Sequence, residues 1–421
     1  MGCIYIIGAG LSGLSCAVQL ASRERKVKLF EATGHAGGRC RSFFDEKLGC
    51  TIDNGNHLLF SANLEARSYI NTIGANNEIE EISPARFDFI EPDLSLQWSI
   101  KPGPSYFPLA SLFPKSPVPE TTWRDYKDFF YLYRSSREDT VGNLVNQNSK
   151  MFERLWQPLC KAVLNTNAND SSAYLLRKFM ALTLMRGENS CRPIIFKEGL
   201  SDTLVQPALK YLAKNGIKPA FNSPAQKMEI NGSYAKAVHF PKFILTLGKD
   251  DLVVLALPPR ACHKLYSAFE LPTDYRCIIN VHFRIEYERS EIPAANFIGS
   301  IGTISQWIFF KKNIVSVTVS DAEELSKMEN TQIAELIWKE VTKICDFEQK
   351  NIPPWRVIKE RHATIAQTPQ TLKTRPNSGT QIKNLFIAGD WTNTDLPATI
   401  ESSIFSGRKV ASLICDQHFK S

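Results

Sequence analysis

The chain has 421 residues, which is more than one simple hydrophobic core accommodates, so we expect two domains. With 43% hydrophobic and 22% charged residues, the composition is typical of a folded soluble protein rather than a disordered one. The net charge of +7 is spread along the sequence, so it permits attraction to an anionic membrane surface but gives no reason to expect nucleic-acid binding.

A glycine motif follows the first predicted strand, which runs from Cys3 to Ile7, and precedes a predicted helix. Gly8 permits the tight strand-to-helix turn, Gly10 lets backbone approach a pyrophosphate, and Gly13 lets helix and strand pack closely. The N-terminus of the helix offers free N–H groups to phosphate. The residues expected to surround the phosphates are Gly8, Gly10, Leu11, Ser12 and Gly13.

An acidic residue ends the second predicted strand, Val27 to Phe30. Glu31, followed by Ala32, lies eighteen residues after Gly13, close to the usual spacing for a carboxylate that binds ribose hydroxyls. Strand, helix, strand and acid in this order indicate a dinucleotide site. The alternative is a glycine-rich turn in an ordinary α/β sheet.

Two further polar turns follow. Gly38 and Arg39 lie in a glycine-arginine loop, residues 34–42, that suits a position beside phosphate, although a surface loop with solvated arginines is the common alternative. The turn at residues 51–57 contains Asp53 and His57, which are candidates for functional groups near a cofactor. Taken alone, each is more often an ordinary turn residue.

The middle of the chain is rich in proline between residues 84 and 119 and mostly helical between 122 and 186. Residues 104–117 are apolar and aromatic, and could enter a bilayer interface or pack on their own domain. An apolar stripe that includes Trp156 at helical spacing is either core or the wall of an apolar tunnel. Predicted strands and helices then follow, among them a helix over Gly199 to Ala213 with Ser201 as N-cap and one over Glu323 to Ile344.

A second glycine-acid corner, Gly389-Asp390, follows a predicted strand at Leu385 to Ala388 and precedes a helix over Thr399 to Cys415. In a two-domain flavoprotein this corner would hold the ribityl chain and the flavin ring, while the first corner holds the pyrophosphate. The N-terminus of the last helix would then face the flavin carbonyl that gains negative charge on reduction. The alternative for Asp390 is a helix cap.

No stretch reaches the roughly 18 uninterrupted apolar residues of a spanning helix, and the N-terminus enters the first strand directly, so we expect a cytoplasmic protein without a signal peptide. The ten cysteines contain no C-x-x-C pair and no zinc spacing, which favours reduced thiols and no metal site.

Together these residues resemble the superfamily of flavin-containing amine oxidases and phytoene desaturases. The matching residues are Gly8-Ala9-Gly10-Leu11-Ser12-Gly13, Glu31, Gly37-Gly38-Arg39, Ala256-Leu257-Pro258-Pro259 and Ala388-Gly389-Asp390. The resemblance implies bound FAD and an α/β fold, with a Rossmann-like FAD-binding domain of the amine oxidase type and a mixed α+β substrate domain. It places the first in residues 1–70, 193–260 and 375–421, and the second in residues 71–192 and 261–374. The FAD-binding residues that it implies are Gly8, Gly10, Leu11, Ser12, Gly13, Glu31, Ala32, Gly38, Arg39, Gly55, Asn56, His57, Gly389, Asp390, Ala398, Thr399 and Ile400.

A narrower resemblance is to the squalene-associated FAD-dependent desaturases, also called hydroxysqualene dehydroxylases. The motifs are Asp53-Asn54-Gly55-Asn56-His57-Leu58-Leu59, Leu155-Trp156-Gln157-Pro158-Leu159-Cys160, Leu164-Asn165-Thr166, Gly389-Asp390-Trp391-Thr392 and Leu396-Pro397-Ala398-Thr399-Ile400-Glu401. The chain departs from the family at Ser402-Ser403, where Gly-Ala is usual, at Phe405, where Arg is frequent, and at Asn56, where Gln is usual.

This resemblance implies reduction of hydroxysqualene to squalene, with loss of water, in hopanoid biosynthesis. A proton donor should assist the departing hydroxide, and Asp53 and His57 are the candidates. The alternatives are another FAD-dependent enzyme, either a phytoene-type desaturase or an amine oxidase, and a flavin-binding protein without activity. A lipophilic triterpene substrate predicts attachment to one leaflet at the inner face of the cell membrane. The sequence does not indicate the electron donor.

Overall fold

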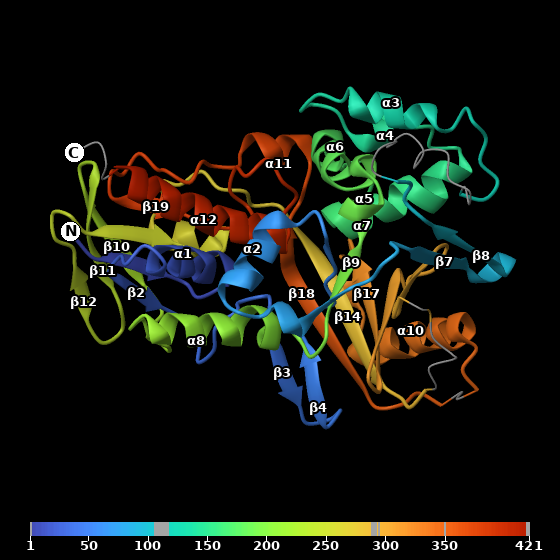
Figure 1. The fold of residues 1–421 in the computed structure, drawn as a ribbon, viewed down its shortest axis with the longest axis horizontal. Helices are drawn as coiled ribbons and strands as arrows, with labels where there is room; N and C mark the ends of the chain where they lie inside the picture. Colours follow the sequence, from blue (N-terminus) through green and yellow to red (C-terminus); the bar gives the residue numbers. More distant parts are fainter. Residues whose placement is uncertain (1, 105–117, 288–292, 294, 349–350, 418–421) are drawn as a thin grey trace.

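A computed structural model describes residues 2–104, 118–287, 293, 295–348 and 351–417 of the chain. The molecule is elongated, with a parallel sheet and its helices at one end and a larger, mostly antiparallel sheet at the other (Figure 1). The apolar stretch at residues 104–117, for which a bilayer interface and a loop packed on its own domain are the two alternatives, lies outside the described residues except for Pro104. Within the described part of the chain, no helix combines the length and the apolar character that crossing a membrane requires.

The parallel sheet joins strands from three distant parts of the sequence. Its order is β19-β13-β1-β2, and all neighbours are parallel. These buried four- and three-residue strands are β1 (Ile4–Ile7), β2 (Val27–Phe30), β13 (Leu252–Leu255) and β19 (Leu385–Ile387). Parallel strands buried on both faces carry continuous apolar runs rather than alternation, which is why these short segments could be recognised.

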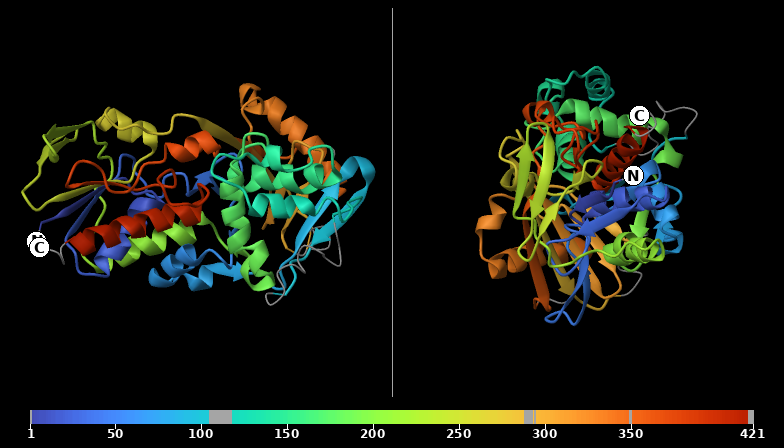
Figure 2. Two further views of the ribbon diagram at one scale, coloured as in Figure 1. Left: turned by 90° about the horizontal axis from the view of Figure 1, so that it is seen from above. Right: turned by 90° about the vertical axis from the view of Figure 1, so that its left-hand side faces the viewer.

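Helices and strands cover the two faces of this sheet. One face packs against α1 (Leu11–Ala21), α8 (Gln206–Lys214) and α12 (Ile400–Gln417), which share a buried apolar cluster with it. The other face packs against a three-stranded antiparallel sheet and α9 (Pro259–Leu265). That small sheet comprises β10 (Lys227–Asn231), β11 (Tyr234–His239) and β12 (Ile244–Thr246). Figure 2 shows α12, in red, running along this end of the molecule, and α1 contacts both α12 and α8.

The second sheet has the order β18-β14-β17-β16-β15-β7-β8, and its strand pairs are antiparallel except for β15 with β7. Helix α10 (Asn330–Cys345) packs against one face through a buried cluster. The strands are β7 (Phe87–Glu91), β8 (Leu96–Ile100), β14 (Tyr275–Arg284), β15 (Phe297–Ser300), β16 (Trp307–Lys311), β17 (Ile314–Ser320) and β18 (Trp355–Ile365).

A helical layer lies beside this sheet (Figure 1). The predicted apolar stripe packs in the core of this layer: Trp156 is fully buried, and Phe152, Leu155, Leu159 and Val163 are partly buried against the same cluster. The interpretation of that stripe as core therefore holds for Trp156. The helices are α3 (Lys127–Tyr133), α4 (Val141–Leu144), α5 (Gln157–Leu164) and α6 (Ala173–Leu182).

Smaller elements connect these parts. One is the hairpin of β3 (Ser42–Asp45) and β4 (Cys50–Asp53). Another is the small sheet β5-β9-β6, which shares the buried apolar cluster of the parallel sheet. The remaining elements are β5 (Leu59–Phe60), β6 (Ile79–Glu81), β9 (Pro193–Phe196), α2 (Leu64–Thr72), α7 (Glu188–Cys191) and α11 (Pro369–Lys373).

Two predicted helix starts are wrong. The long helix begins at Asn330 rather than Glu323, because a 3₁₀ turn at Leu325–Lys327 precedes a capping box formed by Glu329 and Gln332. Ser201 is no N-cap: it lies in a π-helical turn, Ser201–Val205, and its hydroxyl accepts the N–H of Ser42 at 2.7 Å. The proposed division into domains stays a prediction.

Candidate active site

The turn after β1 has the geometry that its glycines predict. Gly8 has φ +106°, and a Cβ there would lie 2.3 Å from the carbonyl oxygen of Ala256. A Cβ at Gly13 would lie 1.9 Å from the carbonyl oxygen of Gly8, so α1 packs against the turn at a distance that only glycine allows. A Cβ at Gly10, in contrast, would meet no atom within 4 Å. The N-terminus of α1 therefore faces open space, which suits the approach of a phosphate.

Glu31 lies beside this turn, at the carboxyl end of β2. One carboxylate oxygen accepts the N–H of Ala9 at 2.9 Å, and the other accepts the N–H of Thr33 at 2.9 Å. These bonds fix an acceptor next to the glycine turn, where a ribose would need one. Ala32 is exposed beside it.

Arg39 links the two glycine corners, which lie at opposite ends of the sequence. Gly37 donates its N–H to the carbonyl oxygen of Ala9 at 2.8 Å, which brings the glycine-arginine loop against the first turn. The guanidinium of Arg39 then reaches Asp390 at 2.7 Å. This pairing with Asp390 raises the pKa of Arg39. Asp390 is not a helix cap, because α12 begins only at Ile400.

The 53–57 turn lies against the glycine-arginine loop that carries Arg39. Asn54 donates its side-chain N–H to the carbonyl oxygen of Arg39 at 3.1 Å. The Asp53 carboxylate accepts the hydroxyl of Ser42 at 2.6 Å and the N–H of Leu200 at 2.9 Å, and lies 3.5 Å from the Lys311 ammonium. The side chain of Asp53 on β4 thereby connects β3, the segment before α8 and β16.

His57 is surrounded by protein, which lowers its pKa to about 4, while the Asp53 charge opposes and the Arg39 charge adds to that shift. Its side chain is nevertheless exposed to a water-sized molecule, and so is that of Arg39. With a pKa of about 4, the ring of His57 is neutral at pH 7.

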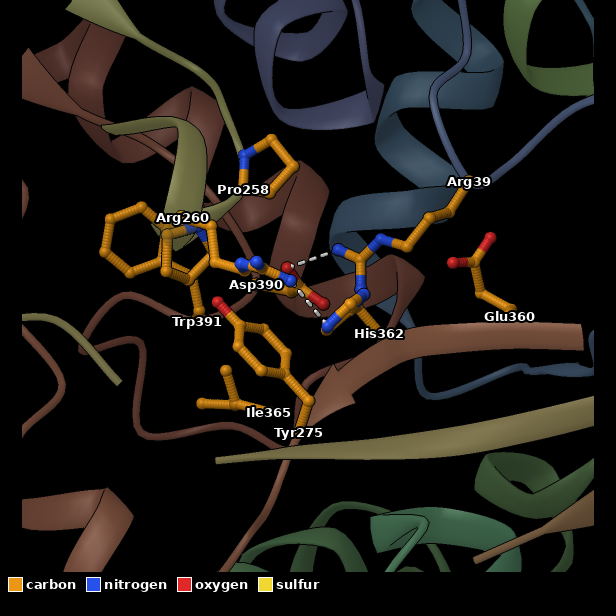
Figure 3. A pocket seen from close by; sticks show the side chains of 10 residues that line it. Arg39, Pro258, Arg260, Tyr275, Glu360, His362, Ile365, Asp390 and Trp391 are labelled. Atoms are coloured by element: carbon orange, nitrogen blue, oxygen red, sulfur yellow. Dashed lines mark hydrogen bonds and ion pairs between the residues drawn. The ribbon is translucent and has the colours of Figure 1, made fainter. Parts of the chain in front are cut away.

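A cavity of about 210 Å³ lies at the junction of the two large sheets. Figure 3 shows Arg39 and Asp390 paired on one side of it, and Arg260 with His362 at 2.9 Å as a second pair. Its lining residues are Arg39, Pro258, Pro259, Arg260, Tyr275, Glu360, His362, Ile365, Asp390 and Trp391. The predicted Ala-Leu-Pro-Pro motif thus contributes its prolines to the wall.

The start of α12 is held by side chains that the sequence did not identify. Gln367 accepts the N–H of Ala398 at 2.7 Å, and the buried Arg375 donates to the carbonyl oxygen of Leu396 at 2.7 Å. Burial lowers the pKa of Arg375 to about 10. Thr399 lies in the same turn and accepts the N–H of Ser402. These contacts fix the N-terminus of α12 beside Asp390, whose carbonyl oxygen accepts the hydroxyl of Ser402 at 3.4 Å.

Two further residues were missed on β14. Asn280 packs so closely on the 53–57 turn that a Cβ at Gly55 would lie 2.9 Å from its side-chain nitrogen. Its side-chain oxygen accepts the Thr318 hydroxyl at 2.8 Å, and Asn56 bonds the same hydroxyl at 3.0 Å. His282, two residues along, is buried with a pKa lowered to about 4. The available signal was Asn and His at alternate positions of an otherwise apolar strand.

The arrangement fits FAD. Empty space at Gly10, a fixed carboxylate at Glu31, and the solvent-accessible side chains of Arg39 and His57 lie on segments that hydrogen bonds hold against one another. FAD would need these features for its pyrophosphate, its ribose and its flavin ring. No group of three or more His, Cys, Asp or Glu side chains in the described ranges is arranged to hold a metal ion.

Comparison with known proteins decides the family. The family model described as flavin containing amine oxidoreductase matches residues 11–415. The chain is 39% identical over 412 residues to hydroxysqualene dehydroxylase of Rhodopseudomonas palustris, covering 98% of both chains. It is 36% identical over 410 residues to the Sinorhizobium fredii protein of that name, covering 97% of both. The chain belongs to the flavin-containing amine oxidoreductase family and, within it, to the hydroxysqualene dehydroxylases.

Solved structures agree on the fold. A putative protoporphyrinogen oxidase from Exiguobacterium has a TM-score of 0.71 at 14% identity, and a putrescine oxidase has 0.74 at 12% identity, each with 99% of both chains covered. The predicted α/β fold of the amine oxidase type is confirmed. The protein is an FAD-dependent oxidoreductase. The individual FAD-binding residues stay predictions.

Proposed function

We propose that this protein reduces hydroxysqualene to squalene with loss of water. Identity of 36–39% over nearly the whole length to proteins named hydroxysqualene dehydroxylase is the observation that carries the proposal. The reaction replaces a C–OH bond by a C–H bond, and the departing oxygen leaves as water after it takes a proton. When bound in its reduced form, FAD supplies the hydride.

A buried aromatic cluster that includes Phe60, close to the 53–57 turn, would suit a lipophilic substrate. Phe60, three residues after the 53–57 turn, lies 5.5 Å from Phe179 and 6.0 Å from Phe87 between ring centroids, so rings from α6 and β7 pack on it. Phe87 in turn lies 6.2 Å from Phe297 on β15. Such a wall would exclude water and protect an allylic cation from capture.

For the proton, we favour His57 over Asp53. The Asp53 carboxylate contacts Ser42, Leu200 and Lys311, whereas the His57 side chain is accessible to solvent. With a pKa of about 4 its ring is neutral at pH 7, so it would donate an N–H hydrogen bond to the departing oxygen rather than act as a strong acid. Ala398, Thr399 and Ile400, fixed through Gln367, would present the N-terminus of α12 to the reduced flavin.

Lipid chemistry also motivates our proposal of attachment to one membrane leaflet, at the inner face of the cell membrane. The electron donor that reduces FAD is not part of this proposal.

The direct test is a single anaerobic turnover. Photoreduced holoprotein is mixed with hydroxysqualene in detergent, flavin absorbance is followed, and the products are extracted. We expect about one squalene per flavin reoxidised. Reoxidation by phytoene-type polyenes or by amines, with no squalene from hydroxysqualene, would contradict the assignment.

A further inference from the structure

Exposed aromatic side chains gather at one place on the surface, at and just before α3. The exposed fractions are 67% for Trp123, 52% for Phe130, 49% for Tyr131 and 55% for Tyr133. On the opposite side of the same helix, Leu132 is fully buried. The outward side of the helix thus carries three large aromatic rings beside Lys127, whereas a surface helix of a soluble protein usually turns mainly polar residues outward.

Cations, rather than carboxylates, stand over these rings. Arg124 and Lys127 lie 5.6 and 5.4 Å from the centre of the Trp123 ring, and Arg134 lies 4.3 Å from that of Phe130. The neighbouring Asp125 is used locally, since its carboxylate accepts both the N–H and the hydroxyl of Thr122. Aromatic rings mixed with Lys and Arg suit the boundary between lipid headgroups and acyl chains.

The exposed aromatic side chains of α3 lie on the helical layer, close to the loop that precedes α12. Figure 1 shows α3 at the outer edge of the helical layer, above α6. Just beyond α3, Arg137 pairs with Asp395 at 2.6 Å and contacts the Tyr174 hydroxyl of α6 at 3.2 Å. Asp395 lies in the loop that precedes α12. On the inner side, Phe129 packs on Trp156 at 4.6 Å. A surface bound to α3 would therefore lie over the layer that borders the site.

We propose that Trp123, Phe130, Tyr131 and Tyr133, the aromatic face of α3, dock the protein on an anionic lipid bilayer. The rings enter the headgroup boundary, and Arg124, Lys127 and Arg134 meet lipid phosphates. The purpose of docking, access to an apolar substrate dissolved in the bilayer, rests on the proposed function. The surface itself is defined independently of it.

The test is co-sedimentation with vesicles of phosphatidylcholine alone and with phosphatidylglycerol added. The variant carries Trp123→Ser, Phe130→Ser and Tyr131→Ser. The matched control carries Phe44→Ser and Ile244→Ser, which remove side chains exposed to 64% and 59% on β3 and β12, away from α3. We expect the variant's partition onto anionic vesicles to fall on the order of 100-fold, and that of the control to stay within about threefold of the wild type.

Two further measurements separate the outcomes. The triple variant should reduce hydroxysqualene in detergent at the wild-type rate but lose turnover of substrate embedded in vesicles. Light scattering should show the same oligomeric state for wild type and variant. Equal vesicle binding by the variant, no binding by the wild type, or loss of a dimer in the variant would each overturn the docking proposal. Failure of the wild type to act on hydroxysqualene in detergent would overturn the proposed function, and vesicle binding would still be read independently.

Discussion

Arg39 is the residue at which the separate parts of the site meet. Its side chain pairs with Asp390 and donates to the carbonyl oxygen of Ala363, and its own carbonyl oxygen accepts from Asn54. A single arginine thus contacts the C-terminal corner, the strand β18 and the 53–57 turn. Because a guanidinium has several donors in one plane, it can hold these groups and still meet a phosphate.

Glu401 allows a prediction at the same scale. Its two carboxylate oxygens accept the N–H groups of Ala66 at 2.8 Å and Glu65 at 3.0 Å, at the start of α2. Burial nevertheless raises its pKa to about 7 from 4.5, although those N–H groups oppose the shift. A carboxyl whose pKa is higher in the folded state binds its proton more tightly there. The stability that the protonated Glu401 carboxyl contributes to the folded state is therefore fully present below about pH 4.5 and is lost as the pH rises to about 7.

We expect Glu401→Gln to gain stability relative to the wild type by about 1–2 kcal/mol between pH 5 and pH 8, because the amide does not ionise. Urea unfolding of both proteins at the two pH values measures this difference. Since every other titrating group is common to the two chains, their difference isolates Glu401. The account would be contradicted if the difference in unfolding free energy stayed constant, or shifted in favour of the wild type, as the pH rises. The N–H bonds to the Glu401 carboxylate would then stabilise its charge more than burial destabilises it.

At the scale of elements, the contact of α1 with α12 joins the first and last parts of the chain. Gly407 makes it possible, because a Cβ there would lie 2.1 Å from the carbonyl oxygen of Ser12. Ser15 adds a hydrogen bond of 2.8 Å to the carbonyl oxygen of Ile404. The two helices, whose N-termini we propose to face the pyrophosphate and the flavin, are thereby packed against each other.

Gly407→Ala should destabilise the protein by about 2–4 kcal/mol and weaken FAD retention, because backbone on both sides must move apart. Gly379→Ala is the control: its Cβ would meet nothing within 4 Å, so a change within about 0.5 kcal/mol is expected. Thermal and urea unfolding measure both. Equal stabilities of the two variants would mean that α1 and α12 adjust at no cost.

How far the sequence predicts elements depends on where their contacts lie. The strands at residues 4–7 and 385–387 were predicted because short apolar runs next to glycines are local signals. Ser201 was misassigned as a cap because its partner, Ser42, is far away in sequence. The start of α10 was predicted too early because Leu325 continues the apolar spacing into a 3₁₀ turn.

At the scale of the whole molecule, two sheets built from interleaved segments meet at the site. The resemblance predicted the residues with sequence signatures, such as Gly10, Glu31 and Asp390. It could not predict Gln367, Arg375 or Asn280, because each acts through a partner in another element, and single residues of these types carry no local pattern. These supporting contacts form only in the folded chain, so no local pattern marks the residues that make them.

Gly10 offers the most direct test that these distant corners close on one FAD. Its φ of −71° suits any residue, and its Cβ would meet no protein atom. Gly10→Val should therefore leave the unfolding temperature of the apoprotein unchanged while filling the space at the N-terminus of α1. Calorimetric titration of apoprotein with FAD is the measurement. We predict one FAD per wild-type chain and a Kd raised by about 100-fold or more in the variant. Wild-type affinity in Gly10→Val, or a wild-type protein that takes up no FAD, would contradict the account.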